Sequence, residues 1–152
     1  MPQAFFVVGH EKWGKSTTLA ALANLGPHGK KFYCDSRRFE VRHMSNDDKP
    51  ESWQKFVENL DASVYSHVII ALCPKPDVQL LLRNLRRKYD LFFWIIQRSH
   101  NGYPHSRGDD GRVISLDEEQ VLRSLGTVEV FTQLADHSDR ATAFENFIRT
   151  HR

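Results

Sequence analysis

The chain lacks any hydrophobic run that approaches the ~20 residues of a membrane-spanning helix, and it lacks the basic-then-apolar start of a secretory signal. It also lacks a strong charge of one sign. The formal net charge is +2, which is too weak to indicate nucleic-acid binding by itself. These absences argue against membrane-spanning and secreted classes of protein. We therefore expect a soluble protein of the cytoplasm with no membrane partner.

Cysteine is scarce as well, with 2 residues in 152. Cys34 and Cys73 both stand in apolar, strand-like runs, and a disulfide is unfavourable in a reducing compartment. We therefore predict two buried free thiols. The remaining composition, 40% hydrophobic and 26% charged, is that of an ordinary globular protein, and the length fits one domain over 1–152.

One segment carries most of the functional information, because it matches the phosphate-binding pattern G-x-x-x-x-G-K-[ST] in full. Its residues are Gly9, His10, Glu11, Lys12, Trp13, Gly14, Lys15 and Ser16. An apolar run of strand length, 4–8, precedes the pattern, and an Ala/Leu-rich helix is predicted to follow from Thr17. A strand, a glycine loop and a helix in this order are the context that the pattern requires.

Each residue type in this loop suits the binding of a triphosphate. The glycines let the backbone turn tightly, so that successive N–H groups point at the phosphates, and the following helix adds the positive end of its dipole. Lys15 would reach the β- and γ-phosphates, and the Ser16 hydroxyl would ligate Mg²⁺. Including Thr17 of the helix, we predict that 9–17 bind a nucleoside triphosphate with Mg²⁺.

On this motif the chain resembles the P-loop NTPase superfamily. The resemblance implies a three-layer α/β fold that binds ATP or GTP together with Mg²⁺. Many kinases and GTPases have a glycine where this chain has Lys12, and Trp13 is bulky for its position. Glu11, at the second variable position, is similar to the loop of recombinase-type ATPases. The loop alone therefore does not assign a subfamily.

The pattern of apolar residues predicts strands that alternate with helices five times. The predicted strands are 4–8, 31–35, 68–72, 91–96 and 128–131. Helices are predicted between them, including one that opens with the capping-box pair Ser115 and Glu118. Such alternation indicates a mainly parallel five-stranded sheet with helices on both faces and a ligand site at the carboxyl ends of its strands.

One long irregular segment, 97–114, interrupts this alternation after the fourth predicted strand. A loop of this length inside a compact domain is usually a lid or a binding loop, or else it is disordered. We predict a lid-like loop. Its arginines Arg98, Arg107 and Arg112 would close over the phosphates and contact the substrate.

Kinase chemistry is the first functional interpretation. The strand 68–72 is followed by Cys73 and not by the Asp that helps to place Mg²⁺ in energy-coupling ATPases. Asp35, after the second predicted strand, is expected at the sheet edge facing the phosphates, where it would deprotonate an acceptor hydroxyl. Arg37 and Arg38 would hold an anionic acceptor. This arrangement resembles the small kinases of polynucleotides, gluconate and adenylylsulfate, which implies a small-molecule, nucleotide or nucleic-acid acceptor.

Two alternatives stay open. In a divergent GTPase-like switch, 39–44 would pair with 31–35 as an antiparallel hairpin, and 46–48 would stand where such proteins carry a carboxylate linked to Mg²⁺. The segment 97–100 would then occupy the guanine-reading position, although its residue types differ from the usual Asn-Lys-x-Asp. In a non-enzymatic protein, bound nucleotide would set the affinity for a protein partner that contacts Trp13.

Overall fold

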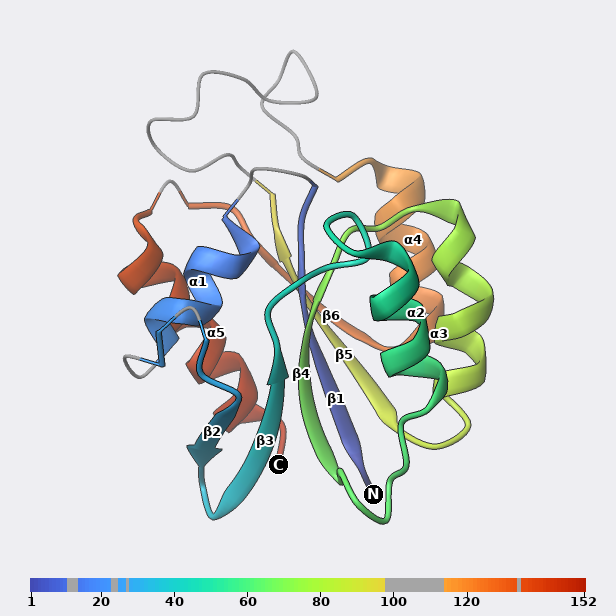
Figure 1. The fold of residues 1–152 in the computed structure, drawn as a ribbon. Coiled ribbons are helices and arrows are strands. Elements are labelled where there is room, and N and C mark those ends of the chain that lie inside the picture. The colour runs from blue at the N-terminus through green and yellow to red at the C-terminus, as the bar shows by residue number, and fades with distance from the viewer. Residues whose placement is uncertain (11–13, 23–24, 27, 98–113, 134) are drawn as a thin grey trace.

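The described part of the chain forms a sheet of six strands, whereas the sequence predicted five. The structure is a computed structural model that describes residues 1–10, 14–22, 25–26, 28–97, 114–133 and 135–152 (Figure 1). The strands are β1 (Gln3–Val8), β2 (Lys31–Cys34), β3 (Arg37–Arg42), β4 (His67–Leu72), β5 (Asp90–Ile96) and β6 (Thr127–Phe131). The helices are α1 (Lys15–Ala21), α2 (Pro50–Glu58), α3 (Gln79–Leu85), α4 (Leu116–Leu125) and α5 (His137–Thr150), with a short 3₁₀ turn η2 (Pro76–Val78) before α3.

The sheet is mainly parallel. Its strands lie in the order β2-β3-β4-β1-β5-β6, and every neighbouring pair is parallel except β2 and β3. Helices α1 and α5 cover one face, while α2, α3 and α4 cover the other (Figure 1). The prediction of an α/β fold with a mainly parallel sheet is therefore confirmed. The predicted strand count is wrong, because β3 adds a strand beside β2.

Strand β1 is central, and its side chains are buried on both faces. Phe6 packs beneath α2, α3 and α4 and stacks on Phe93, with ring centroids 5.0 Å apart. On the opposite face, beneath α1 and α5, Phe5 stacks on Phe92 at 4.5 Å. Burial on both faces explains why 4–8 is a continuous apolar run and not an alternating one.

The turn between β2 and β3 reverses the chain within two residues. Asp35 and Ser36 have φ angles of 51° and 63°, and positive φ at both positions is typical of a hairpin turn that follows the twist of its strands. Phe32 pairs with Phe39 across the hairpin. The antiparallel hairpin expected for the GTPase-like alternative is present, but its second strand is Arg37–Arg42 and not 39–44. We call the edge where the parallel strands end the carboxyl edge, and the edge where they begin the amino edge.

Helices α4 and α5 begin at side-chain caps. The Ser115 hydroxyl accepts a hydrogen bond from the Glu118 amide (3.1 Å), and the Glu118 carboxylate accepts one from the Ser115 amide (2.9 Å). The predicted capping box of α4 is therefore confirmed. At α5 the Asp136 carboxylate accepts from the Asp139 amide at 2.8 Å. Within the residues described, no helix combines the length and apolar character needed to cross a membrane.

Candidate functional site

The strand order creates a crevice at the middle of the carboxyl edge. Strands β1 and β4 are neighbours, but β1 continues into α1 on one face while β4 continues into α3 on the other. In open α/β sheets, ligands bind at such a switch point, outside the carboxyl ends of the strands. The described ends of the motif, Gly9–His10 and Gly14–Ser16, lie at this point directly after β1.

Backbone hydrogen bonds hold both ends of the motif. The Gly9 amide donates to the Leu72 carbonyl at 3.0 Å, so the pairing of β1 with β4 continues one residue past the strand. The Gly14 carbonyl accepts from the Thr18 amide at 2.9 Å, which forms the first turn of α1. Between these two anchors, Glu11, Lys12 and Trp13 lie outside the described part of the chain.

Lys15 turns back over the loop. Its side chain is buried, and Nζ donates to the His10 carbonyl oxygen at 2.9 Å. Lysine is rarely buried, because removing its ammonium group from water costs free energy that only hydrogen bonds or a counter-charge offset. The structure therefore places a positive charge beside the backbone of the motif, where an anion would gain most from it.

Gly14 is enclosed by two side chains of α5. A Cβ atom added at this position would lie 2.9 Å from Arg140 Nη1 and 3.2 Å from His137 Cε1. The φ angle of Gly14 is 88°, so glycine is needed both for the backbone conformation and for the close approach. Arg140 is fully buried. Helix α5 thus brings a second cation to the motif from the far end of the sequence.

Sequence analysis missed Arg140 and His137 as site residues. For Arg140 a signal was present, since it stands four residues before Phe144 and eight before Ile148, a spacing that puts it on the same face of a helix as these two apolar residues. A charged residue on such a face indicates a buried partner or ligand, because charged side chains are almost never fully buried unless paired. His137 carries no comparable signal.

His10 connects the motif to two neighbouring elements. Its Nδ1 lies 3.6 Å from Cys73 Sγ, at the end of β4, and its Nε2 lies 3.3 Å from Glu118 Oε1 of α4. His10 and Cys73 are both buried. The side chain therefore ties the start of the loop to both sides of the crevice rather than pointing to solvent.

Asn46 joins the ends of β3 and β4. Its side-chain Nδ2 donates to the Cys73 carbonyl at 2.8 Å, and its Oδ1 accepts from the Cys73 amide at 2.7 Å. The amide group thus satisfies both backbone groups of a buried residue. Of the neighbouring carboxylates, Asp47 forms an ion pair with Lys75 at 2.5 Å, and Asp48 accepts from the Ser45 amide and hydroxyl at 3.1 Å.

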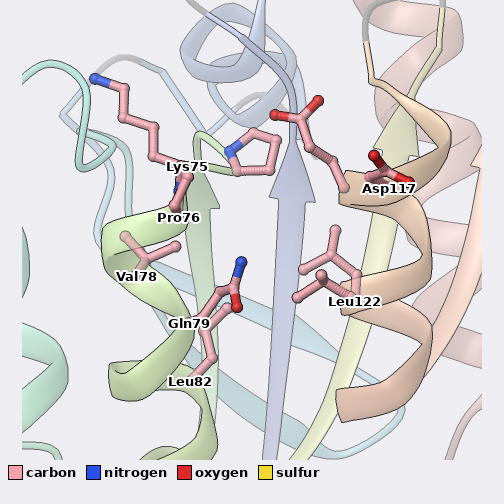
Figure 2. Close-up of a pocket in the computed structure, with 10 residues that line it drawn as sticks. Lys75, Pro76, Val78, Gln79, Leu82, Asp117 and Leu122 are labelled. Carbon is pink, nitrogen blue, oxygen red and sulfur yellow. The ribbon is translucent and has the colours of Figure 1, made fainter.

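A small pocket opens beside the loop between η2, α3 and α4 (Figure 2). Its volume is about 170 Å³, and Val78, Leu82 and Leu122 form apolar walls. Lys75 and Asp117 stand at its polar rim (Figure 2). Glu118, which contacts His10, also lines this pocket, so the pocket is connected to the motif through one side chain.

A larger pocket lies on the other side of the motif. Ser16 and Thr17 are exposed at the start of α1, whereas Thr18 is buried. Ser16 lines a pocket of about 660 Å³ that extends to the end of β3. The hydroxyl predicted to ligate Mg²⁺ therefore belongs to a residue that a ligand can reach.

Asp35 lies at the amino edge, opposite the motif, so its predicted placement facing the phosphates is wrong. The reason is the antiparallel direction of β2, which carries Asp35 to the edge where β1 begins. Asp35 is surrounded by arginines: Oδ1 lies 2.9 Å from Arg149 Nη1 and 3.3 Å from Arg152 Nη2, and Oδ2 lies 3.5 Å from Arg37 Nη2. These contacts make Asp35 part of an ion-pair cluster and not of the loop.

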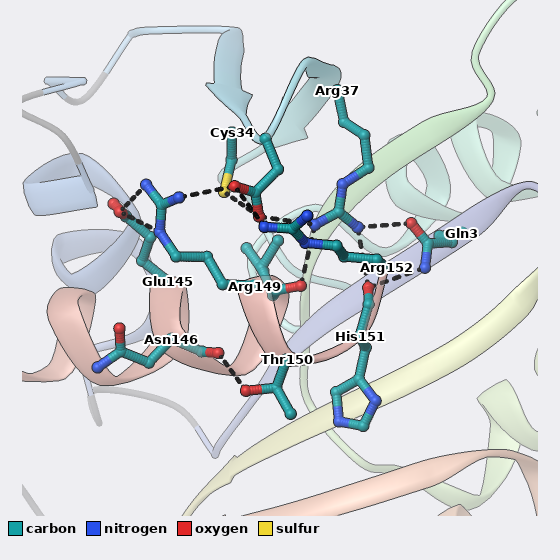
Figure 3. Close-up of polar contacts among 11 residues, drawn as sticks. Gln3, Cys34, Arg37, Glu145, Asn146, Arg149, Thr150, His151 and Arg152 are labelled. Carbon is teal, nitrogen blue, oxygen red and sulfur yellow. Dashed lines mark hydrogen bonds and ion pairs between the residues drawn. The ribbon is translucent and has the colours of Figure 1, made fainter.

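Arg37 and Arg38 are misplaced for the same reason. Arg37 donates to Gln3 Oε1 at 2.7 Å and to the carbonyls of His151 and Ile148 at 2.9 and 3.0 Å (Figure 3). Gln3 is the first residue of β1, so these contacts mark the amino edge. Arg38 is exposed on the same strand. Neither residue is brought to the motif, and their predicted role in holding an acceptor is not supported by this placement.

The three loop arginines Arg98, Arg107 and Arg112 lie outside the described residues. The two ends of their segment are described, and they are joined: the Ile114 amide donates to Oε1 of the buried Gln97 at 3.0 Å. The prediction that these arginines contact the substrate stays a prediction.

Both cysteines are free and buried, as predicted. Burial is the main cause that raises the pKa of the Cys34 thiol above its ordinary value, with Arg149 opposing the shift. A neutral thiol in such surroundings is unreactive, because the thiolate is the nucleophile. Cys34 is therefore a packing residue of the core beneath α1 and α5.

No family model matches the chain, and no curated protein or solved structure matches it either. Within the part of the chain that the structure describes, no group of three or more His, Cys, Asp or Glu side chains is arranged to hold a metal ion. The geometry of the motif, of Arg140 and of the neighbouring pockets is therefore the basis for assigning a function.

Proposed function

We propose that the chain binds a nucleoside triphosphate with Mg²⁺ at residues 9–17 and transfers its γ-phosphoryl group to a hydroxyl acceptor. The observation that carries this proposal is the buried Lys15 ammonium, which is folded onto the His10 carbonyl at the end of the central strand. This lysine belongs to a complete phosphate-binding motif at the switch point of the sheet. ATP or GTP would be the phosphoryl donor.

Three features of the described residues fit a polyphosphate. Gly14 has the positive φ of a tight turn. Lys15 and Arg140 supply two positive charges beside that turn, and both are shielded from water. Positive groups that are held in place in a dry site stabilise developing negative charge more than the same groups would in water. The motif therefore suits the binding of phosphates and the stabilisation of charge during transfer.

Ser16 is the residue that would hold Mg²⁺. It is exposed at the start of α1 and lines the pocket that reaches β3. Bound Mg²⁺ would neutralise negative charge on the phosphate oxygens. Asp47 and Asp48 are not assigned to the metal, because Asp47 is paired with Lys75 and Asp48 with the Ser45 amide and hydroxyl.

In the proposed reaction the bond from the γ-phosphorus to its bridging oxygen breaks, the acceptor oxygen bonds to phosphorus, and the acceptor proton passes to water. Asp35 has no part in this step, since it lies at the amino edge. A pocket of about 660 Å³ beside Ser16 favours an acceptor larger than water, because small-molecule sites have volumes of roughly 300–1,000 Å³.

A nucleotide-dependent switch is the second candidate. The observation in its favour is the antiparallel hairpin of β2 and β3, which that alternative requires. Strand β4, however, lies between β3 and β1. The segment 46–48 therefore follows a strand that is not adjacent to β1, the strand that leads into the motif, and this weakens its comparison with the Mg²⁺-linked carboxylate of a switch. For this reason we place phosphoryl transfer first.

Thermal unfolding tests the proposal directly. Purified protein would be heated with ATP or with GTP, each in the presence and absence of Mg²⁺. A ligand at a hundredfold its Kd that binds only the native state adds about 2.7 kcal/mol to the free energy of unfolding, which raises Tm measurably. We expect a rise with ATP and Mg²⁺, whereas a response to GTP alone would place the switch first.

The matched variants are Lys15→Ala and Lys55→Ala. Lys55 is exposed on α2, away from the motif, so its loss should leave the nucleotide-induced rise in Tm unchanged. Lys15→Ala should abolish that rise. An equal rise in the wild type and in Lys15→Ala would contradict the proposal, as would the absence of any rise in the wild type.

A further inference from the structure

The pocket beside Ser16 is lined by both apolar and polar side chains. The polar ones come from the start of α1, from the residues before β2, and from β3 and the residue after it: Ser16, His28, Lys30, Glu40, Arg42 and His43. We call this cavity the β3 pocket. All of these residues belong to the described part of the chain, and they bring the predicted Mg²⁺ ligand into one cavity with a set of basic groups.

Cations outnumber carboxylates among the charged side chains of the β3 pocket, and Val41, Met44 and Phe56 supply the apolar part of its lining. Lys30 and Arg42 carry permanent positive charges, and two histidines stand beside them, against the single carboxylate of Glu40. Among the described residues, no ion pair engages Lys30 or Arg42. A cavity with this excess of cations attracts an anionic ligand.

Two of the basic side chains are held in place. The Arg42 guanidinium lies 5.4 Å from the centroid of the Phe56 ring and donates to the Ser52 hydroxyl. His43 Nε2 contacts the Gly29 carbonyl, and the His43 side chain is buried. Side chains that are fixed before binding lose little conformational entropy when a ligand arrives. The wall of the β3 pocket is thus organised ahead of binding.

We propose that the β3 pocket binds a small phosphorylated molecule, which is the acceptor of the γ-phosphoryl group. Arg42 and Lys30 contact its phosphate, and its hydroxyl faces Ser16. This inference rests on the proposed function, because Ser16 is the residue that joins the two sites. Guanidinium and ammonium groups are the side chains that recognise phosphate, and the volume of about 660 Å³ accommodates a nucleoside monophosphate or a sugar phosphate.

Binding of nucleoside monophosphates, measured by titration calorimetry without and with the donor nucleotide and Mg²⁺, tests this assignment. Inorganic phosphate is the second probe, since it shares the anion but lacks the hydroxyl-bearing part. We expect the wild type to bind at least one monophosphate more tightly than inorganic phosphate. Arg42→Gln and Lys30→Gln should each weaken that binding about tenfold, since hydrogen bonds to charged groups are the stronger ones.

The control is Arg38→Gln, which removes an exposed arginine from the other end of the same strand. It should leave monophosphate affinity unchanged. Arg42→Lys keeps the charge, and comparing its Tm with that of Arg42→Gln separates a loss of binding from a loss of folding. If Arg42→Gln does not fold, the Lys30→Gln titration decides.

The outcomes separate this inference from the proposed function. If the wild type binds the donor nucleotide but no monophosphate, the β3 pocket assignment alone is overturned. The same holds if Lys15→Ala abolishes monophosphate binding while Arg42→Gln and Lys30→Gln spare it, because the anion would then occupy the motif itself. A wild type that binds no donor nucleotide would overturn the proposed function.

Discussion

The two edges of the sheet both gather charged side chains, but they use them differently. At the amino edge, the Asp35 carboxylate meets Arg37, Arg149 and Arg152, and Arg37 also donates to Gln3 and to two backbone carbonyls (Figure 3). Positive and negative groups there satisfy one another. Such a cluster holds the C-terminal end of α5 against the start of β1 and β3, and it offers little to a ligand.

At the carboxyl edge, the excess of positive groups is found at the motif and in the β3 pocket, and not in the smaller pocket, where Lys75 stands with Asp117 and Glu118. The Lys15 ammonium rests on a backbone carbonyl, Arg140 is buried against Gly14, and the β3 pocket sets Lys30 and Arg42 against Glu40 alone.

In the described part of the chain, no ion pair engages Lys30 or Arg42, whereas the arginines of the amino edge are paired with Asp35. The comparison of the β3 pocket with the amino edge teaches that a cluster of charges indicates binding where its cations have no carboxylate partner. A charged residue that follows a strand in the sequence can belong to either edge, so its position next to a strand end does not tell whether it belongs to an ion-pair cluster or to a binding site.

The largest expected effect comes from Gly14→Ala. The left-handed conformation costs a non-glycine residue about 1–2 kcal/mol, and the new Cβ would also displace the Arg140 guanidinium. A displacement of about 1 Å at an active site lowers turnover by roughly 10²-fold, and we expect a loss of this size in γ-phosphoryl transfer. Steady-state kinetics and urea unfolding would measure the two effects.

Gly26→Ala is the matched control for this substitution. Gly26 has a φ of 79°, close to that of Gly14, but an added Cβ would meet nothing within 4 Å. It should therefore show the conformational cost in urea unfolding and leave turnover intact. Equal losses of turnover in both variants would mean that the contact with Arg140 is unimportant to the carboxyl edge.

An intermediate effect is expected for Asn46→Ala. The buried Cys73 amide would lose its acceptor, whereas the Cys73 carbonyl would still accept from the Lys75 amide at 2.9 Å. An unsatisfied buried polar group costs about 1–3 kcal/mol. We expect the urea midpoint to fall accordingly. Asn46→Asp keeps the acceptor for the Cys73 amide but loses the donor to its carbonyl. If both variants were as stable as the wild type, Asn46 would not be joining β3 to β4.

The smallest expected effect is that of Asp35→Asn at the amino edge. Two of its three arginine partners, Arg149 and Arg152, are 46% and 73% exposed, so solvent and salt screen their attraction. The third, Arg37, is shielded, but it lies 3.5 Å away and also donates to Gln3 and to two backbone carbonyls. We expect Tm to fall by about 2–4 °C in low salt, less in 1 M NaCl, with phosphoryl transfer unchanged. A loss of transfer in this variant would show that the amino edge takes part in the reaction and would break the comparison.

Features whose partners lie close along the chain were predictable. The capping box of Ser115 and Glu118 spans four residues and formed as expected. The apolar run 4–8 also predicted a strand correctly, and burial of β1 on both faces explains why that run is continuous. The buried thiols Cys34 and Cys73 follow from the same reasoning.

The place of Asp35 could not be predicted in this way. A carboxylate after a strand lies at the carboxyl edge only if that strand is parallel to its neighbours, and the direction of β2 depends on how it pairs with β3. That pairing needs the turn at Asp35 and Ser36, whose positive φ angles are supported by the strands on either side. Nothing in 31–35 alone distinguishes the two directions.

The amino-acid sequence by itself determined the motif at 9–16, the alternation of strands and helices, and the apolar run that forms β1, since each depends on residue types within one local window. The tertiary structure decided the position of β4 between β3 and β1, the contact of Arg140 with Gly14 and the basic groups that line the β3 pocket. These features join residues far apart in the chain. Which distant segments meet is set by the packing of the whole sheet, where burial of apolar faces outweighs any local preference.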